Sequence, residues 1–479
     1  MYSAFETISD AVDVCIIGGG AAGIAMAVTL AKRGHHILLC EGGDASYSER
    51  SQENYRGDIV GDAYHPLETT RLRHLGGSTN HWGGICRPLD DYDFTAKQAA
   101  SETGWPINHA VLSPYLNAAM RLLSLEPVPP DQRIEGAGLK RTHFSLGPPT
   151  RLKEKYAATL SESTSLECCL TANLVGLETQ DGKVTTATFK NYQGDSRQVR
   201  ARYFVVACGG IENSRLLLWC NQQTQGQLIP QADSLGRYWM EHPHATVGKA
   251  LLFEPAALGL DKDHTVFLSP TAPSISSRKI LNCGLRLHRM NTEVTQQLID
   301  ELAGQAPTLA GRMRTWQAQG RVMHGAMLRA AWEQEPRHEN RIELSDELDE
   351  LGVPRSRLVW RQSDLDRRTI RESLQLLGEY LRDHDVGRLQ MAEWLAETPV
   401  QLPTEGELAG RHHMGGTRMS LEAEEGIVNP DCRLFAQENV YVAGSSVFAS
   451  AGHANPTLTL VQLALRLCDH LESKLTKGV

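Results

Sequence analysis

Near its N-terminus the chain carries three glycines in the pattern Gly18-x-Gly20-x-x-Gly23, directly after the apolar run 12–17. This order predicts a strand, a tight glycine turn and a helix that continues through 25–31 and ends near Gly34. A second apolar run at 37–40 predicts the next strand. The N-terminus is therefore expected to form a β-α-β unit, which requires two parallel strands joined by the helix.

Such a unit is typical of a dinucleotide site. The first glycine permits the tight turn, the second lets the backbone approach a pyrophosphate, and the third lets the helix pack on the strand. Glu41 lies 23 residues beyond Gly18, where an acid can accept hydrogen bonds from a ribose hydroxyl. Together these features predict a dinucleotide site, and the alternative is a plain tight turn in an α/β protein. The glycines alone do not distinguish NAD from FAD.

Composition excludes several other classes of protein. The formal net charge of −9 argues mildly against nucleic-acid binding, which favours a basic face. The N-terminus shows no secretory signal, and no apolar run approaches the ~18–20 residues that span a bilayer. The 10 cysteines are scattered without zinc-type spacing, so no metal site is expected. We expect a reducing cytoplasm, a large core and about two to four domain-sized units.

The remaining patterns predict an interrupted nucleotide-binding domain. The stretch 42–103 is loop-rich, and so long an irregular connection is usually functional. Strands at 167–175, 184–190 and 203–210, with a helix at 212–220, are expected to continue the first domain, which a strand at 440–444 and a helix at 456–475 complete. A helix is also predicted at 365–383. Strands of an inserted antiparallel sheet are expected at 245–253, 281–289, 322–332, 341–344 and 357–361.

Two further segments carry more specific patterns. The first is the cluster 71–84, Arg-Leu-Arg-His-Leu-Gly-Gly-Ser-Thr-Asn-His-Trp-Gly-Gly, and the second is the C-terminal pair 411–419 and 452–457. With the N-terminal unit, they resemble the glucose–methanol–choline (GMC) oxidoreductases, and most closely their sugar-oxidising branch. That branch includes pyranose 2-oxidase, C-glycoside 3-oxidases and fructose and gluconate dehydrogenases. Further matches extend the resemblance over nearly the whole chain, at 104–107, 113–115, 207–217, 235–244 and 335–354.

The resemblance implies an α/β fold with a Rossmann-type FAD-binding domain and an inserted substrate-binding domain on an antiparallel sheet, as in GMC and p-hydroxybenzoate-hydroxylase-like proteins. The implied domains are 1–95, 165–244 and 405–479 for FAD, and 96–164 and 245–404 for substrate. His81 matches a position that is covalently bonded to the flavin in some members and hydrogen-bonded in others. The residues expected to bind FAD are Gly18, Gly20, Ala22, Gly23, Glu41, Gly76, Gly77, Ser78, Asn80, His81, Trp82, Gly83, Val175, Ala207, Gly444, Ser445, Asn455, Pro456 and Thr457.

Oxidation of an alcohol by a flavin requires a base for the hydroxyl proton and a donor for the developing alkoxide. The resemblance places His412 as the base and Asn455 as the amide partner. His413 is an adjacent rival, and because consecutive side chains diverge, only one of the two is expected to face the flavin. His453, His242 and His244 are left without a role. A proline after Asn455 is expected to fix a helix N-terminus whose dipole faces the flavin.

The sequence therefore predicts an FAD-dependent enzyme that oxidises a CH–OH group of a sugar, glycoside or polyol by hydride transfer to flavin N5. A steroid or lipid-alcohol oxidase of the same fold is one alternative. A flavin-binding redox subunit without turnover is another, and an NAD-linked dehydrogenase is a third. The electron acceptor, whether oxygen, a quinone or a redox protein, is left open, as are the exact substrate and the oligomeric state.

Overall fold

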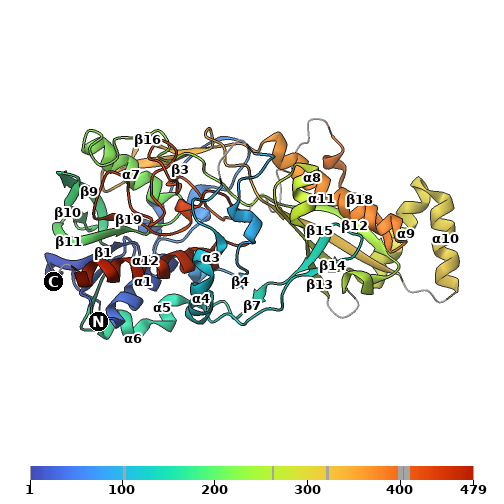
Figure 1. Ribbon diagram of the computed structural model, residues 1–479, viewed down its shortest axis with the longest axis horizontal. Helices are drawn as coiled ribbons and strands as arrows, with labels where there is room; N and C mark the ends of the chain where they lie inside the picture. Colours follow the sequence, from blue (N-terminus) through green and yellow to red (C-terminus); the bar gives the residue numbers. More distant parts are fainter. Residues whose placement is uncertain are drawn as a thin grey trace.

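The computed structural model describes residues 2–100, 104–260, 264–319, 323–397, 403 and 410–477. The molecule is elongated, with both chain ends close together beside one sheet and a pair of helices at the opposite end, beyond a second sheet (Figure 1). No helix in these ranges combines the length and the apolar character that crossing a bilayer requires.

The first sheet has the strand order β8-β2-β1-β11-β10-β9, and β19 pairs with β11. Strands β8, β2, β1, β11 and β19 are parallel, whereas β10 and β9 extend the sheet as antiparallel strands. The strand bounds are β1 Ala11–Ile17, β2 Ile37–Cys40, β8 Leu166–Cys169, β9 Asn173–Gln180, β10 Lys183–Lys190, β11 Ser196–Val206 and β19 Val440–Val442. Segments from the N-terminus, the middle and the C-terminus of the chain therefore share one sheet.

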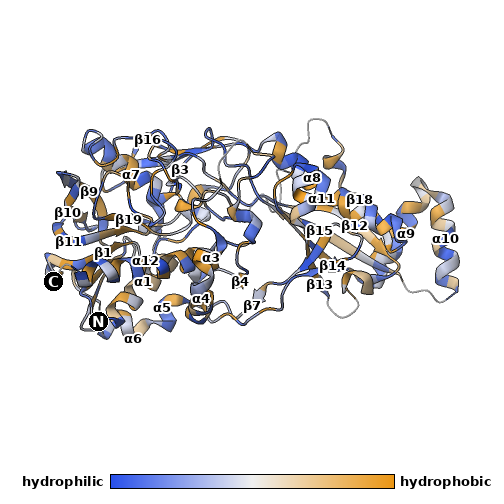
Figure 2. Cartoon of the chain, in the orientation of Figure 1, coloured by the Kyte–Doolittle hydropathy of each residue, from blue (hydrophilic) through white to orange (hydrophobic). Residues whose placement is uncertain are grey.

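Helices α1 (Ala21–Lys32) and α12 (Thr457–Lys477) pack on one another, although they lie at opposite ends of the sequence. The α1 sequence is rich in alanine and almost entirely buried. On α12 the buried apolar residues recur every three or four positions, as on an amphipathic helix that covers a core. Figure 2 shows hydrophobic residues on both ribbons. The predicted β-α-β unit and the predicted closing helix are confirmed.

The second sheet is antiparallel and has the order β18-β12-β15-β14-β13-β6-β5. Helix α11 (Asp364–Asp383) contacts this sheet. A capping box between Ser363 and Asp366 begins the helix, and Ile370, Leu374 and Leu377 are buried along it. The strand bounds are β5 Gln132–Arg133, β6 Leu139–Thr142, β12 His244–Leu252, β13 Thr265–Pro270, β14 Cys283–Arg289, β15 His324–Trp332 and β18 Gly387–Met391.

Two of the strands predicted for this sheet lie elsewhere. Strands β16 (Arg341–Leu348) and β17 (Pro354–Trp360) form a separate sheet with β3 (Gly57–Gly61), which pairs parallel to β17. This sheet has its own small core, which includes Tyr64, Leu67, Ile211, Trp239 and Trp360. The prediction failed because β3 comes from the loop-rich stretch, where its short run gave no strand signal.

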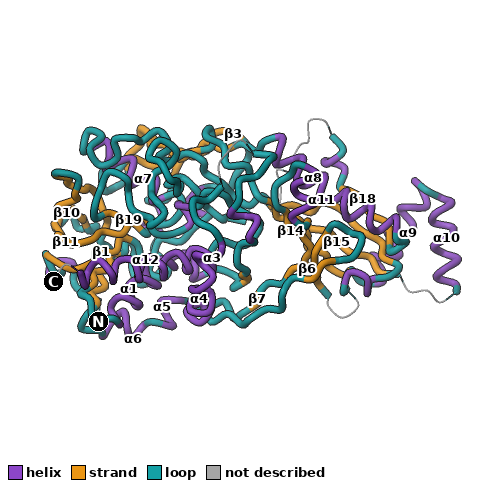
Figure 3. Tube along the Cα trace, in the orientation of Figure 1, coloured by secondary structure: helices purple, strands orange, loops and turns teal. Residues whose placement is uncertain are grey.

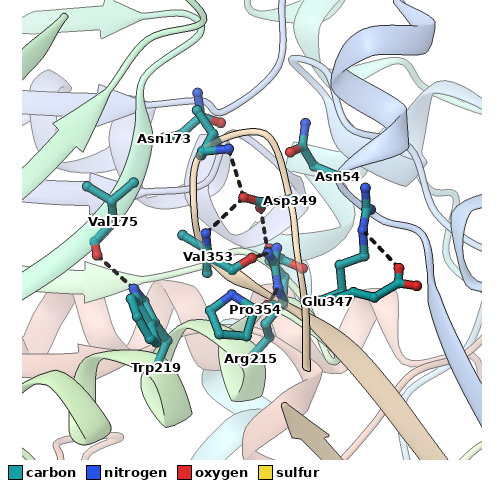
Figure 4. Close-up of polar contacts among 12 residues, drawn as sticks. Asn54, Asn173, Val175, Arg215, Trp219, Glu347, Asp349, Val353 and Pro354 are labelled. Atoms are coloured by element: carbon teal, nitrogen blue, oxygen red, sulfur yellow. Dashed lines mark hydrogen bonds and ion pairs between the residues drawn. The ribbon is translucent and has the colours of Figure 1, made fainter. Parts of the chain in front are cut away.

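A buried ion pair joins this third sheet to helix α7 (Glu212–Gln223). Arg215 on α7 lies 2.5 Å from Asp349 in the turn between β16 and β17, and it also donates to the Pro354 carbonyl at 2.6 Å. Asp349 in turn accepts from the Val353 backbone N–H (Figure 4). Both charged side chains are almost fully buried, so removing one would leave the other as an unpaired buried charge and destabilise the fold.

Other differences from the predictions are local. The strand expected at 167–175 is two strands, β8 and β9, because Thr171 turns the chain with φ of 55°. Helices α9 (Thr292–Gln305) and α10 (Pro307–Ala318) form the helical pair at the far end and were not predicted. Residue 322, the first of the strand expected at 322–332, lies outside the described residues. The shorter elements are α2 Glu49–Glu53, β4 Ile85–Cys86, α3 His109–Leu112, α4 Leu116–Leu123, β7 Ser145–Leu146, α5 Leu152–Lys155, α6 Ala157–Glu162 and α8 Ala272–Arg278.

The stretch 96–164 divides between the two ends of the molecule. Its helices α3 and α4 pack against α12 and α5 against α1, whereas β5 and β6 belong to the second sheet. The β4–β7 pair lies between these parts, as Figure 1 shows. The division of the chain into an FAD-binding and a substrate-binding domain stays a proposal, and the packing of α3 to α5 favours assigning them to the first.

Candidate active site

A cavity of about 460 Å³ opens at the carboxyl ends of the parallel strands. In α/β sheets this edge is where ligands bind. In the middle of the molecule, between the first and second sheets, the chain consists mainly of loops (Figure 3). The predicted site residues that line the cavity come from all three parts of the chain: Gly18, Gly20, Ala22, Glu41, Gly77, Ser78, His81, Trp82, Gly83, Ala207, His412, Gly444, Ser445, Asn455, Pro456 and Thr457.

The glycines of the first turn have different physical roles. At Gly18, φ is 111°, and an added Cβ would lie 2.6 Å from the carbonyl oxygen of Ala207 on the neighbouring strand. At Gly23 a Cβ would lie 1.8 Å from the carbonyl oxygen of Gly18, so the residue is needed for helix–strand packing. At Gly20, by contrast, a Cβ would meet no described atom within 4 Å, because this position faces the cavity.

Glu41 follows β2 and fixes the turn from the other side. Its buried carboxylate accepts backbone N–H groups from Gly19 at 2.8 Å and Gly43 at 2.7 Å. The residue thus lies at the cavity wall beside the glycine turn, where the motif places a ribose-binding acid.

The second glycine-rich segment packs directly on the first. Gly76 has φ of 94° and donates its N–H to the Gly19 carbonyl at 2.8 Å. The position where Gly77 would carry a Cβ lies 3.2 Å from the Cα of Gly20. Gly76 and Asn80 do not line the cavity themselves, and Asn80 instead donates to the Leu75 carbonyl at 2.9 Å. These two residues hold the loop rather than form the wall.

Two predicted residues lie away from the cavity for clear reasons. Gly23 is inside the first turn of α1, where it contacts Gly18. Val175 lies on β9, and its carbonyl accepts the indole N–H of Trp219 at 3.0 Å (Figure 4). Its neighbours Asn173 and Leu174 line the cavity in its place.

The structure adds polar lining residues that the sequence patterns did not single out. Arg71 is buried, lies over the ring of Tyr55 at 4.0 Å, and is 3.6 Å from Glu212. Its three guanidinium nitrogens have no hydrogen-bond partner among the described residues. Arg73 donates to Asn173 at 2.9 Å. The arginine-rich composition of the loop was the signal available, but composition does not indicate which arginine faces inward.

The segment that carries His412 is held between two others. Met414 and Met240 exchange backbone hydrogen bonds of 2.8 and 3.0 Å, which places 411–413 beside 241–244. Ser445 donates its hydroxyl to the His413 carbonyl at 2.6 Å. The backbone N–H of His412 donates to the carboxylate of Glu241 at 2.6 Å. The position of His412 is therefore fixed by its main chain.

The rings of His412 and His413 have different environments. His412 Nδ1 lies 2.9 Å from Nδ1 of His242, and burial lowers the pKa of His412 well below its ordinary value. His413 Nε2 lies 3.1 Å from the hydroxyl of Tyr64, and burial lowers the pKa of His413 to about 3. Both residues line the cavity, but the His413 ring already has a partner through Nε2.

Asn455 and the start of α12 complete the cavity wall. Asn455 donates one amide N–H to the Ile85 carbonyl at 2.7 Å, which leaves the second for a ligand. Pro456 accepts the N–H of Leu460 at 2.9 Å, so the helix begins one residue later than predicted, at Thr457. His453 does not line the cavity. It is buried, and its Nε2 lies 3.8 Å from Oδ2 of Asp90.

The cavity residues fit FAD on structural grounds. Gly20 leaves open space at the N-terminus of α1, and the first turn of α1 carries no acidic residue that would repel a pyrophosphate. Glu41 lies where a ribose is expected, and Arg71 offers buried donors without acceptors among the described residues. A second helix N-terminus, that of α12, meets the same cavity and would favour negative charge on a bound flavin.

Comparisons with known proteins agree with this chemistry. The family of FAD dependent oxidoreductases matches residues 13–318, and the GMC oxidoreductase C-terminal family matches residues 336–464. The fructose dehydrogenase large subunit of Gluconobacter japonicus is 25% identical over 332 residues, which are 67% of this chain and 57% of that subunit. The 6'''-hydroxyparomomycin C oxidase of Streptomyces lividus is 23% identical over 97% of this chain and 92% of its own.

Among solved structures, pyridoxine 4-oxidase from Mesorbium loti superposes with a TM-score of 0.59 at 15% identity, over 96% of this chain and 99% of that one. The likeness at this identity concerns the fold, and it agrees with an FAD-binding Rossmann-type domain joined to a second domain. By its sequence, the chain belongs to the FAD-dependent oxidoreductases, and its C-terminal part matches the GMC oxidoreductases among them.

Proposed function

We propose that this protein oxidises a CH–OH group of a sugar, glycoside or polyol to a carbonyl, with His412 as the general base and Asn455 as its partner. FAD, when bound, supplies N5 as the hydride acceptor. The observation that carries the proposal is that His412 and Asn455 line the same cavity as the glycine turn and Glu41. The sugar substrate is supported by the relatives, one of which is named for fructose.

Each of the two side chains is suited to its part of the reaction. Because burial lowers the pKa of His412, its imidazole is neutral near pH 7 and can accept a hydroxyl proton. The second amide N–H of Asn455 can donate to the oxygen as it becomes an alkoxide, and the bond to Ile85 holds the amide in place.

Replacing His412 by alanine tests the assignment. In His412→Ala, we expect the rate of FAD reduction by substrate under anaerobic conditions to fall by about 10²–10⁴-fold, while FAD stays bound. The exposed His384, at the end of α11, provides a matched His384→Ala control that should keep the wild-type rate. Wild-type reduction kinetics in His412→Ala would overturn the role of this residue.

The substrate class is tested by bleaching of the flavin absorbance against a panel of sugars, glycosides, polyols, sterols and long-chain alcohols. Bleaching by sterols or long-chain alcohols alone would replace the sugar proposal with a lipid-alcohol oxidase. No bleaching by any alcohol would favour a redox subunit. Re-oxidation by air, by a quinone or by a redox protein then identifies the acceptor.

Two further proposals concern the cofactor bond and the compartment. We propose that His81 either bonds covalently to the flavin or contacts it, which its position in the cavity lining supports. After acid precipitation, yellow colour in the pellet indicates the bond and colour in the supernatant indicates its absence. We also propose a cytoplasmic location, which the free thiol state of all ten cysteines supports.

A further inference from the structure

Directly behind His412, a second histidine is in contact with it. His242 is fully buried, and its Nδ1 lies 2.9 Å from Nδ1 of His412, with the two rings nearly perpendicular. Two neutral imidazoles at this distance share one hydrogen, so one Nδ1 must donate it and the other must accept it. Which ring donates decides which nitrogen of His412 is left as a base.

The other nitrogen of His242 settles the direction. His242 Nε2 lies 2.8 Å from the backbone carbonyl oxygen of Gly452, and a carbonyl can only accept a hydrogen bond. His242 Nε2 must therefore carry a hydrogen. Burial lowers the pKa of His242 to about 4, so at neutral pH the ring carries no second hydrogen and its Nδ1 is a lone-pair acceptor.

It follows that His412 donates from Nδ1. A neutral His412 then has its lone pair on Nε2. This atom makes no hydrogen bond within the described part of the chain, and it is not among the buried polar atoms without partners. It is therefore the ring nitrogen of His412 that is accessible from the cavity the residue lines.

The main chain keeps the two rings in register. One oxygen of the Glu241 carboxylate accepts the backbone N–H groups of His242 at 2.8 Å and His412 at 2.6 Å, and the other accepts the hydroxyl of Tyr64. Glu241 thus ties both histidine backbones to one buried group. The Nδ1–Nδ1 contact does not depend on flexible side chains alone.

We infer that His242 is a positioning residue that fixes His412 in the tautomer with hydrogen on Nδ1, so that Nε2 accepts the substrate proton. The inference rests on the proposed role of His412. In the step, the substrate O–H bond breaks, a new N–H bond forms at His412 Nε2, and the C–O bond becomes a carbonyl as the carbinol carbon loses the hydride, which N5 of bound FAD would accept. The resulting imidazolium keeps its Nδ1–H directed at the His242 lone pair, which stabilises the positive charge.

The tautomer itself can be observed without a substrate. Histidine-selective ¹⁵N labelling of the FAD-loaded enzyme distinguishes protonated from unprotonated ring nitrogens, and the His412→Gln spectrum assigns the His412 signals. We expect Nδ1–H and an unprotonated Nε2 for His412 in the wild type. An Nε2–H form of His412 in the wild type would overturn the inference, whether or not His412 is the base.

Two variants test the contribution of His242. The amide oxygen of His242→Asn can stand near the place of Nδ1 and accept the His412 hydrogen, whereas His242→Leu removes the acceptor. We expect His242→Asn to keep the wild-type tautomer and most of the rate of FAD reduction by substrate. His242→Leu should gain the Nε2–H form and lose rate in step with the population of that form, up to the roughly 10⁴-fold loss of a base held wholly in the wrong tautomer.

The two proposals can fail separately. If His242→Leu keeps an unprotonated Nε2, the positioning role is wrong. If the tautomers change as expected but FAD reduction does not, the general-base role of His412 is wrong instead. Should His242→Leu not fold, as judged by its thermal melt and flavin content, the wild-type spectrum and the His242→Asn comparison still decide.

Discussion

A single methyl group at Gly20 should separate cofactor binding from folding. Gly20 precedes α1 with φ of −83° and ψ of −163°, a conformation that alanine adopts without strain, and its Cβ would meet no described atom within 4 Å. Gly20→Ala should therefore leave the stability of the apoprotein unchanged or raise it by about 0.4–1 kcal/mol. In the holoprotein the same methyl would project into the space where we expect the pyrophosphate to approach the backbone. Loss of one hydrogen bond to a charged group, about 1.5–3 kcal/mol, corresponds to an FAD Kd weaker by about 10–150-fold.

The assay is a titration of each apoprotein with FAD, in which quenching of flavin fluorescence reports binding. A thermal melt of each apoprotein measures its stability. Gly23→Ala provides the contrast, because its Cβ would lie 1.8 Å from the Gly18 carbonyl oxygen and must displace α1. We expect Gly23→Ala to lower both stability and FAD affinity. A wild-type FAD Kd in Gly20→Ala would refute the placement of the pyrophosphate at this turn.

Three further predictions concern stability and the thiols. Burial lowers the pKa of His413 to about 3 in the folded protein, against about 6.5 in the unfolded chain. Below pH 6.5 the unfolded chain therefore binds up to one more proton than the folded protein, and the free energy of unfolding falls as the pH falls. Between pH 7 and pH 5, urea melts should show a loss of unfolding free energy about 2 kcal/mol larger in the wild type than in His413→Gln. Asp349→Ala leaves the buried Arg215 without its carboxylate partner and should lower the free energy of unfolding by about 3–5 kcal/mol in the same melts. The control Asp469→Ala breaks the exposed ion pair with Arg33 and should lower it by at most about 1 kcal/mol. Nine of the ten free cysteines are buried, so Ellman's reagent should modify these nine only after denaturation, and rapid modification of more than the half-buried Cys208 in the native protein would contradict this.

The parts of the fold that the sequence predicted are those with a strong local signal. The turn at Gly18, the buried strands around it and the amphipathic α12 each follow from spacing within about 20 residues. Most of the residues expected to bind FAD were taken from the resemblance to the GMC oxidoreductases rather than from local spacing, and most of them line the cavity. Local patterns were sufficient wherever the neighbours in space were also neighbours in sequence.

The features that were missed depend on contacts between distant segments. Strand β3 is stabilised by pairing with β17, some 300 residues away, and its own residues are half exposed. Arg71 and Arg73 both line the cavity, where Tyr55 and Glu212 hold Arg71, and nothing in their neighbouring sequence identifies them as lining residues. Val175 does not line the cavity, whereas Asn173 and Leu174, two and one positions before it on the chain, do.

The lowered pKa of His412 has a consequence for the proposed role of Asn455 as hydrogen-bond donor to the alkoxide. A base that burial keeps neutral is always available near pH 7 but binds a proton weakly, so the substrate hydroxyl must be made more acidic as the proton moves. A donor to the developing alkoxide does this, and the free amide N–H of Asn455 is placed in the same cavity. We therefore expect Asn455→Ala to slow FAD reduction by about 10²–10³-fold in anaerobic stopped-flow measurements.

If the proposed base His412 and the proposed donor Asn455 act on one oxygen, the free-energy effects of replacing them should not add. The double variant His412→Ala/Asn455→Ala should be scarcely slower than His412→Ala alone, as for groups that act as a unit. If the two losses multiplied, the residues would contribute independently rather than as one unit. A shared site for proton and alkoxide would then have to be abandoned, even though both side chains line one cavity.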